Sequence, residues 1–252
     1  MIGEKMNEIL LYLAAKYKGE WNRIYKAIKE KENISEEEFN NLIKSFKQDN
    51  FKFVSIIDKE YPKQLLNISK PPFVLFYEGN WEILNKTKKC VYLTGEYETE
   101  EIIKYIDRLE NSEEYVFFSM FWNGLEKTIL RKLIERKFKV VILLPSGIEY
   151  AKNNLNLDVF QNENCLFLSE YPNNYHSTKE AFYARQRICA CFCKKMILLS
   201  SLDQKYNSVI NEFLDQGKDI ECLIFRDHLN DDKNIELINQ GATLISDKNE
   251  IC

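Results

Sequence analysis

Two arginines separated by a single residue stand out for the chemistry they could do. Arg185 and Arg187 follow Tyr183 in the segment EAFYARQRICACFC, which continues into an apolar stretch. A guanidinium group has planar donors that suit a phosphate, because they can make two parallel hydrogen bonds. The same arginines could instead be structural, at the start of a helix, where they would pair with nearby glutamates. The elements that position them must decide between these roles.

Signatures of catalysis are missing elsewhere in the chain. No G-x-G-x-x-G, G-x-x-x-x-G-K-[ST] or G-x-S-x-G motif occurs, so the dinucleotide, P-loop and hydrolase patterns are absent. The two histidines, His176 and His228, stand among polar residues and are expected at the surface. No acid/base pair with convincing spacing can be named. We therefore expect a protein that is not an enzyme and has no cofactor.

The seven cysteines favour neither a disulfide framework nor a metal site. Their number is odd, and they are scattered through apolar segments of a long chain, as is typical of reduced buried thiols. Cys189, Cys191 and Cys193 have a C-x-C-x-C spacing, but on a helix this spacing spreads the thiols over different faces. No partner cluster follows, so a packed helix is the favoured interpretation.

Composition places the chain among ordinary globular proteins. Its 252 residues are 45% hydrophobic, which is ample for a core, and the formal net charge is -4. A protein with a small net negative charge has no general attraction to nucleic acid, so any site for a polyanion would be a local basic patch. No apolar run is long enough for a membrane span, and the charged N-terminus does not resemble a signal peptide. The expected location is the cytoplasm.

The pattern of apolar residues changes along the chain. Residues 4–48 have apolar positions at three- and four-residue spacings, with Ser35 as the cap of a helix start, which predicts a small helical module. From about residue 88, short apolar runs alternate with helical segments, which predicts parallel strands and crossover helices in an α/β sheet. The predicted strand regions are 90–95, 115–119, 139–145, 165–171, 195–201 and 220–225. Pro71 and Pro72 force an extended chain between the two parts. We therefore expect a helical domain at 1–68, a linker segment packing on the core at 69–87, and an α/β domain at 88–252.

Small or hydroxylic residues follow the predicted strands. The carboxyl ends of parallel strands line one crevice, and small residues before helix N-termini suit an anionic ligand there. Tight turns in any α/β fold also use Gly and Ser, so this pattern alone leaves both interpretations open. The residues concerned are Thr94, Gly95, Ser119, Pro145, Ser146, Gly147, Ser169, Glu170, Ser200 and Ser201.

Several segments, in matching order, resemble the DprA/Smf family of bacterial DNA-processing proteins. FLSEYP at 167–172 and AFYARQRICACFC at 181–193 are similar to the family's SEYP and F-P-x-R-N-R-I-I-A-G-L segments. YPKQLLNISKPPFVLFYEGN at 61–80 is similar to its double-proline linker, and NIELINQGATLISD at 234–247 to its ending. The chain is identified as a divergent member of the family.

The resemblance implies a fold, a site and partners. The fold would be a Rossmann-like, mostly parallel sheet flanked by helices, with an N-terminal domain of the sterile-alpha or helix-hairpin-helix type. Family members bind single-stranded DNA, dimerise and load the RecA recombinase in natural transformation, without a catalytic step or a metal. Tyr183, Tyr171 and Trp122 would offer faces for base stacking. The residues expected to bind DNA or phosphate are Arg185, Arg187, Gly95, Ser119, Gly124, Ser169, Tyr183 and Lys194.

Two turns depart from the family pattern. Where the family has V-G-S-R, this chain has Gly95 followed by Glu96 and Tyr97, so a cationic contact becomes acidic. Where the family has S-G-x-A-x-G-I-D, bulky Met120 and Trp122 replace small residues. These changes keep an alternative open: a degenerate relative that binds a small phosphorylated ligand or a protein partner without binding DNA. A filled, electronegative crevice would favour that alternative.

Overall fold

The computed structural model describes residues 2–48, 52–85, 89–156, 160–202 and 204–245. The chain divides into two compact units. Unit 1 contains residues 1–78, 144–159 and 167–182, and unit 2 contains residues 79–143, 160–166 and 183–252.

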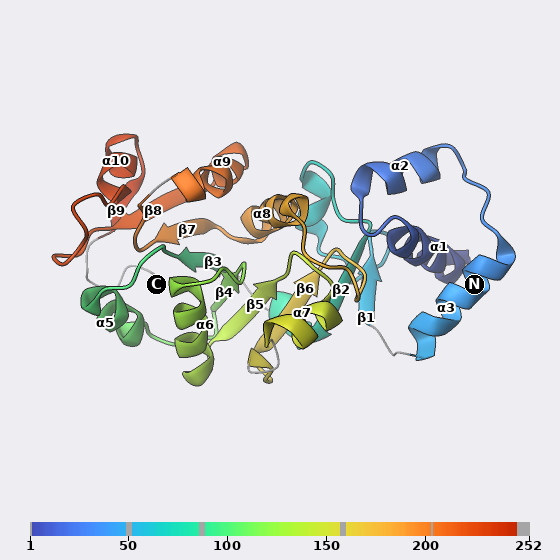
Figure 1. Cartoon of the computed structure of the whole chain (residues 1–252), viewed down its shortest axis with the longest axis horizontal. Helices are drawn as coiled ribbons and strands as arrows, with labels where there is room; N and C mark the ends of the chain where they lie inside the picture. The colour runs from blue at the N-terminus through green and yellow to red at the C-terminus, as the bar shows by residue number, and fades with distance from the viewer. Residues whose placement is uncertain (1, 49–51, 86–88, 157–159, 203, 246–252) are drawn as a thin grey trace. The chain divides into compact units, whose positions relative to one another are not determined.

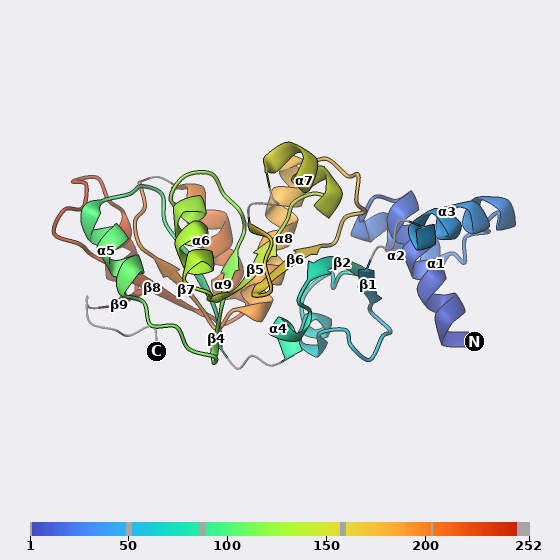
Figure 2. The ribbon, with the colours of Figure 1, turned by 90° about the horizontal axis from the view of Figure 1, so that it is seen from below.

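The helical module of unit 1 consists of α1 (Ile2–Lys16), α2 (Trp21–Lys29) and α3 (Glu36–Gln48). Figure 2 shows the three helices lying together. Their apolar faces form a small core that includes Leu10, Leu13 and Ile43. Ser35 accepts a hydrogen bond from the backbone N–H of Glu38 at 3.5 Å, as predicted for the cap of α3.

Unit 1 also contains strands where the sequence predicted none. β1 (Lys52–Ser55) lies within the stretch assigned to the helical domain, and β2 (Val74–Gly79) lies within the linker segment. The two strands pair antiparallel. Extended chain after Pro71 and Pro72 agrees with the restriction that proline places on its neighbours, but the segment forms a sheet strand rather than a connection. Short 3₁₀ helix η1 (Lys63–Asn67) and α7 (Ile148–Leu155) complete the regular elements that lie wholly in this unit.

Unit 2 is built on parallel strands joined by helices. β3 pairs in parallel with β4 and β7, β4 with β5, β7 with β8, and β8 with β9. Within unit 2 the strand order is β5-β4-β3-β7-β8-β9. The remaining strands are β3 (Lys89–Thr94), β4 (Tyr115–Ser119), β5 (Lys139–Leu143), β6 (Cys165–Ser169), β7 (Lys195–Leu198), β8 (Asp219–Leu223) and β9 (Thr243–Ile245).

The helices of unit 2 cover both faces of these strands. In Figure 1, α5 and α6 lie on one side of β3 and β4, and α9 and α10 lie on the other side of β7 and β8. This arrangement buries the strands on both faces, which explains why they read as continuous apolar runs. The fold is therefore the predicted Rossmann-like, mostly parallel sheet. The helices that follow the strands are α4 (Glu82–Asn85), α5 (Glu100–Arg108), α6 (Leu125–Glu135), α8 (Lys179–Phe192), α9 (Asn207–Asp215) and α10 (Asn234–Asn239).

The six cysteines of the described residues are free and buried, as predicted, and Cys252 lies outside those residues. Burial raises the pKa of the Cys165 and Cys222 thiols to about 12, which keeps both protonated at neutral pH. Among the described residues, no group of three or more potential ligands could hold a metal ion. Within the same part of the chain, none of the helices has the length and apolar character needed to cross a membrane.

Candidate nucleic-acid interface

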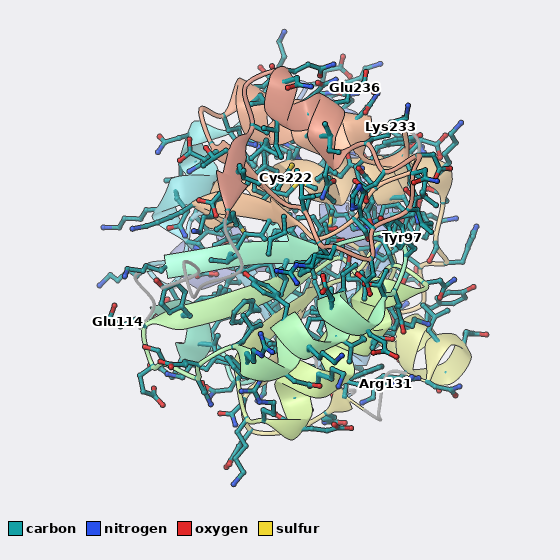
Figure 3. All side chains as sticks on the ribbon, turned by 90° about the vertical axis from the view of Figure 1, so that its left-hand side faces the viewer. Tyr97, Glu114, Arg131, Cys222, Lys233 and Glu236 are labelled. Atoms are coloured by element: carbon teal, nitrogen blue, oxygen red, sulfur yellow. The ribbon has the colours of Figure 1, made fainter. Side chains whose placement is uncertain are left out.

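The strands of unit 2 end at one common edge, and the segments that follow them form the candidate site. Figure 3 shows Tyr97 at this edge and Glu114 at the opposite edge, where the strands begin. Tyr97 follows β3, and Glu114 directly precedes β4, which is parallel to β3. We call the edge at which β3, β4, β5, β7 and β8 end the strand-end edge.

The buried carboxylate of Glu126 organises the centre of this edge. Glu126 lies in the first turn of α6 and is 1% exposed. It accepts hydrogen bonds from Tyr92 at 2.8 Å, from Thr94 at 2.9 Å and from Ser119 at 2.8 Å. Burial raises the pKa of Tyr92 well above its ordinary value, and the charge of Glu126 adds to the rise, so the phenol stays protonated and donates. Glu126 therefore joins the ends of β3 and β4, and Ser119 is engaged with it.

Gly95, which follows β3, is packed against protein rather than open to a ligand. A Cβ atom on Gly95 would lie 2.6 Å from a side-chain carbon of Leu125 and 2.9 Å from Oγ of Ser200. The Ser200 hydroxyl accepts from the N–H groups of Glu96 and Tyr97 at 3.0 and 3.1 Å and donates to the Tyr97 carbonyl at 2.8 Å. The glycine is required here by close packing of the turn on the end of β7.

Carboxylates of the protein accept hydrogen bonds from the backbone N–H groups near the end of β7. Glu96 accepts from the N–H of Leu202 at 2.8 Å. Asp232 accepts from the N–H groups of Ser201 at 3.3 Å and Asn234 at 2.7 Å. A phosphate at a strand end would use such N–H groups. Here these N–H groups already donate to the negatively charged carboxylates of Glu96 and Asp232.

The same holds at the end of β8. Asp227 accepts from the Thr99 hydroxyl at 2.8 Å and from the N–H of Glu101 at 3.2 Å. Glu101 in turn accepts from the N–H of Arg226 at 2.6 Å. The side of the strand-end edge formed by residues 95–101, 200–202 and 226–234 is thus filled and electronegative. We call it the acidic side.

Cations gather around an aromatic ring on the other side of this edge. Trp122 follows β4, and its ring lies 4.8 Å from the guanidinium carbon of Arg185 and 6.0 Å from the ammonium of Lys205. Nearby in the chain, the Lys127 ammonium lies 4.7 Å from the ring of Phe121. Both distances at Trp122 fall within the range of cation–π attraction. We call Trp122, Arg185 and Lys205 the tryptophan cluster.

Arg185 and Arg187 do not converge on one ligand. Both lie on α8, where two residues correspond to a rotation of about 200° around the axis. Arg185 is 1% exposed and donates to the carbonyl of Leu143, the last residue of β5, at 3.2 Å. Arg187 is half-buried and donates to the carbonyl of Ala184, while its own carbonyl accepts from Gln216 at 3.0 Å. Arg185 therefore holds the strand end and Trp122, whereas Arg187 faces another side of the helix.

Tyr183 and Gly124 are accessible. Tyr183 is 50% exposed and lies four residues before Arg187, so the two share a face of α8. Gly124 caps α6 with a φ of +93°, a conformation that favours glycine. A Cβ atom on Gly124 would meet nothing closer than 3.9 Å, so the approach to this helix start is open.

One predicted site residue, Lys194, is not brought to the strand-end edge of unit 2. Lys194 is exposed, but it directly precedes β7 and donates its N–H to the carbonyl of Cys90 near the start of β3, at 2.8 Å. It lies at the opposite edge because a crossover helix returns the chain to where the next strand begins. Ser169 belongs to unit 1, is fully buried, and donates to the carbonyl of Ser146 at 2.7 Å.

Several aromatic and cationic residues around the site lie differently from what their sequence positions predict. Tyr171 is 6% exposed and stacks on Tyr175, so it presents little surface to a base. Met120 is fully buried and does not reach the surface. Lys205 and Lys127 were missed, because neither lies in a recognisable motif. Lys205 and Lys127 lie close to the aromatic residues that follow β4 only because of how the chain folds. The spacing of residues in the sequence does not predict these contacts.

Sequence comparisons show which family this chain resembles. A model of the DNA recombination-mediator protein A family matches residues 52–252. The DNA processing protein DprA of Streptococcus pneumoniae is 27% identical over 219 residues, covering 84% of this chain and 76% of that protein. The DprA protein of Bacillus subtilis is 23% identical over 214 residues, covering 81% and 71%.

Solved structures show the same fold. DprA from Streptococcus pneumoniae superposes with a TM-score of 0.69 at 24% identity, over 89% of this chain and 77% of that one. DNA processing protein A from Helicobacter pylori, solved for its single-stranded DNA binding mode, gives a TM-score of 0.64 at 22% identity, over 77% and 91%. The chain belongs to the DNA recombination-mediator protein A family.

Proposed function

We propose that this protein binds single-stranded DNA through the tryptophan cluster and the neighbouring start of α6. The observation that carries the proposal is a partly exposed ring, Trp122, with Arg185 and Lys205 beside it at 4.8 and 6.0 Å. Rings stack with bases of any sequence, and an exposed cation beside the ring, here Lys205, neutralises a phosphate. Single-stranded DNA binding by the related Helicobacter pylori protein supports the same conclusion.

Within this site, each group has a separate task. Trp122 offers a face for bases, and Lys205 and Lys127 supply charge. Tyr183 and Arg187 lie on another face of α8, away from the tryptophan cluster. Arg185 is a positioning residue, because its guanidinium is buried between the end of β5 and the Trp122 ring. The open start of α6 at Gly124 leaves room for a phosphate beside the ring.

Fluorescence anisotropy with a labelled single-stranded oligonucleotide tests this site. We expect binding that weakens with salt, and a salt slope reduced by about 0.7 for each cation removed, in Lys127→Ala and Lys205→Ala. Lys194→Ala is the matched control, since it removes an exposed lysine at the opposite edge of the same sheet and should leave the slope unchanged. Arg185→Ala is unsuitable, because loss of a buried guanidinium would disturb the fold. Absence of binding by folded protein at low salt would overturn the proposal.

We further propose the family role: loading a RecA-type recombinase onto single-stranded DNA in recombination and natural transformation, as a cytoplasmic homodimer and without a catalytic step. Strand exchange by the recombinase on DNA coated with single-strand-binding protein tests the loading. Addition of this protein should shorten the lag, and Trp122→Ala should not. Light scattering at several concentrations tests the dimer.

A second candidate function rests on the acidic side. The backbone N–H groups that could bind a phosphate there donate instead to carboxylates of the protein. This is expected for a relative that no longer binds DNA and binds a protein partner instead. Under this alternative the oligonucleotide would not bind at any salt concentration, and variants of the tryptophan cluster would have no binding effect to measure.

A further inference from the structure

Unit 1 contains a cavity that takes no part in the site described above. It has a volume of about 300 Å³, within the range of small-ligand sites. One wall comes from the end of α1 and from α3, and the other from the loop that follows β6. The residues that line it are Ala15, Lys18, Ser45, Phe46, Pro172, Asn173, Asn174, Tyr175 and His176.

Stacked rings form the wall contributed by the loop. Tyr171 and Tyr175 stack with ring centroids 4.6 Å apart and planes 11° apart. The His176 ring continues the stack, 5.6 Å from Tyr175 at 20°, and is exposed. Near-parallel rings ending in an exposed ring present a flat face, on which a further planar heteroaromatic ring can stack.

The loop is held rigidly before any ligand arrives. Tyr175 donates its N–H to the carbonyl of Pro172 at 2.9 Å and accepts from the N–H of Gly147 at 2.9 Å, while Tyr150 donates to the carbonyl of Asn173 at 3.0 Å. Gly147 lies so close that a Cβ atom would sit 2.0 Å from the carbonyl oxygen of Asn173. A pre-organised wall lowers the entropic cost of binding.

The opposite wall supplies charge and shape. Lys18 is exposed, with a φ of +52°, at the turn that follows α1. Next to it, Gly19 approaches the loop so closely that a Cβ atom would lie 2.6 Å from the carbonyl oxygen of Glu170. None of the described residues that line the cavity is acidic. A cation beside a flat aromatic face matches a ligand with a planar ring and a phosphate, and the amide of Asn174 can bond to the edge of the ring.

We propose that this cavity binds one nucleotide, with its base on the Tyr175–His176 stack and its phosphate at Lys18. In the context of the proposed function, the nucleotide is an unpaired residue of the bound strand, which gives unit 1 a contact of its own with DNA. A free mononucleotide has the same chemistry, and the experiment separates the two sources.

Photocrosslinking with an oligonucleotide that carries 5-iododeoxyuridine, followed by peptide mapping, tests the site. We expect crosslinks at 172–176, reduced by about tenfold in Tyr175→Leu and retained in Tyr175→Phe, which keeps the ring. Tyr25→Leu is the matched control, because Tyr25 is an exposed tyrosine of unit 1 outside the cavity. Thermal unfolding of each variant checks that the fold is intact.

Charge is tested separately with Lys18→Gln against Lys31→Gln. Both lysines are exposed and have a φ of +52° after a helix, so only the position relative to the cavity differs. Lys18→Gln should lower the crosslink yield at 172–176 severalfold, and Lys31→Gln should not.

Failure of this inference and failure of the proposed function give different results. Crosslinks at Trp122 without any at 172–176, and no Tyr175-dependent binding of dAMP or dTMP in calorimetry, would overturn the cavity inference alone. Tyr175-dependent binding of a mononucleotide without crosslinks at 172–176 would support a nucleotide site that takes the free molecule. Crosslinks at 172–176 identify the strand as the source.

Discussion

The acidic side and the tryptophan cluster lie along one strand-end edge and differ in what satisfies the polar groups there. On the acidic side, Glu96, Asp227 and Asp232 accept from backbone N–H groups and close the turns after β3, β7 and β8. At the tryptophan cluster, two cations lie beside the ring of Trp122, and the start of α6 is open at Gly124. Along one edge, the protein's own carboxylates therefore satisfy the backbone N–H groups on one side, while cations and an open helix start lie on the other.

Glu126 connects the two regions, because its hydroxyl partners come from both β3 and β4. The largest effect is expected for its replacement. Glu126→Gln removes a charged acceptor shared by three donors, and should lower the free energy of unfolding by about 1.5–3 kcal/mol. Urea unfolding measures this loss.

Two controls sharpen that result. Tyr92→Phe removes one donor and should cost about 1 kcal/mol. Glu100→Gln changes a glutamate whose side chain is 85% exposed, and should have little effect on unfolding. A Glu126→Gln protein as stable as wild type would show that the buried carboxylate does not join the strand ends.

The next largest effect concerns DNA affinity at the tryptophan cluster. Trp122→Ala removes the ring and should weaken binding of a single-stranded oligonucleotide by about 1–3 kcal/mol, or about fivefold to 150-fold. Trp122→Phe keeps a smaller ring and should retain part of the affinity. Anisotropy titration of both variants measures the difference. Equal affinities of wild type and Trp122→Ala would remove the cluster from the binding site.

A smaller, opposite effect is expected on the acidic side. Glu96→Gln together with Asp232→Asn keeps acceptor oxygens for the N–H groups but removes two negative charges. Reduced repulsion of the strand should tighten binding by about threefold at low salt and by less at high salt. The control Glu113→Gln removes an exposed negative charge close to the beginning of β4, at the opposite edge. Weaker binding by the double variant would indicate that the carboxylates help to bind DNA, for example through a cation.

The smallest effect is a pH dependence of stability. The pKa of Asp227 lies below its ordinary value: desolvation raises it, but hydrogen bonds from Thr99 and the N–H of Glu101 lower it more. A carboxyl with a depressed folded pKa stabilises the protein above its unfolded pKa, and this stabilisation is lost as the pH falls through the folded pKa. Asp227→Asn should therefore be slightly less stable than wild type at pH 7, and the difference should shrink below pH 4. Unfolding midpoints at the two pH values measure it.

Much of the fold could be predicted from the sequence, because buried parallel strands leave apolar runs. All six predicted strand regions contain a strand. β9 was missed because it has only three residues, and β2 because its apolar run follows two prolines and was assigned to the linker. β1 was missed at the end of a strongly helical pattern.

The site was less predictable, because side-chain direction on a helix matters as much as spacing. Arg185 and Arg187 read as a pair, yet the helical rotation separates them and buries only the first. The order of parallel strands and return helices places Lys194 at the opposite edge, and this could have been inferred. Lys205 could not, since its proximity to Trp122 depends on how α9 and its preceding 3₁₀ turn pack.

Hydrogen–deuterium exchange with and without a single-stranded oligonucleotide tests whether DNA binds at the tryptophan cluster. Binding there should slow exchange at 120–127 and 204–206 and leave exchange at 95–101 and 226–234 unchanged. Protection confined to 95–101 and 226–234 would contradict it, because the strand would then occupy the side that the protein's own carboxylates fill.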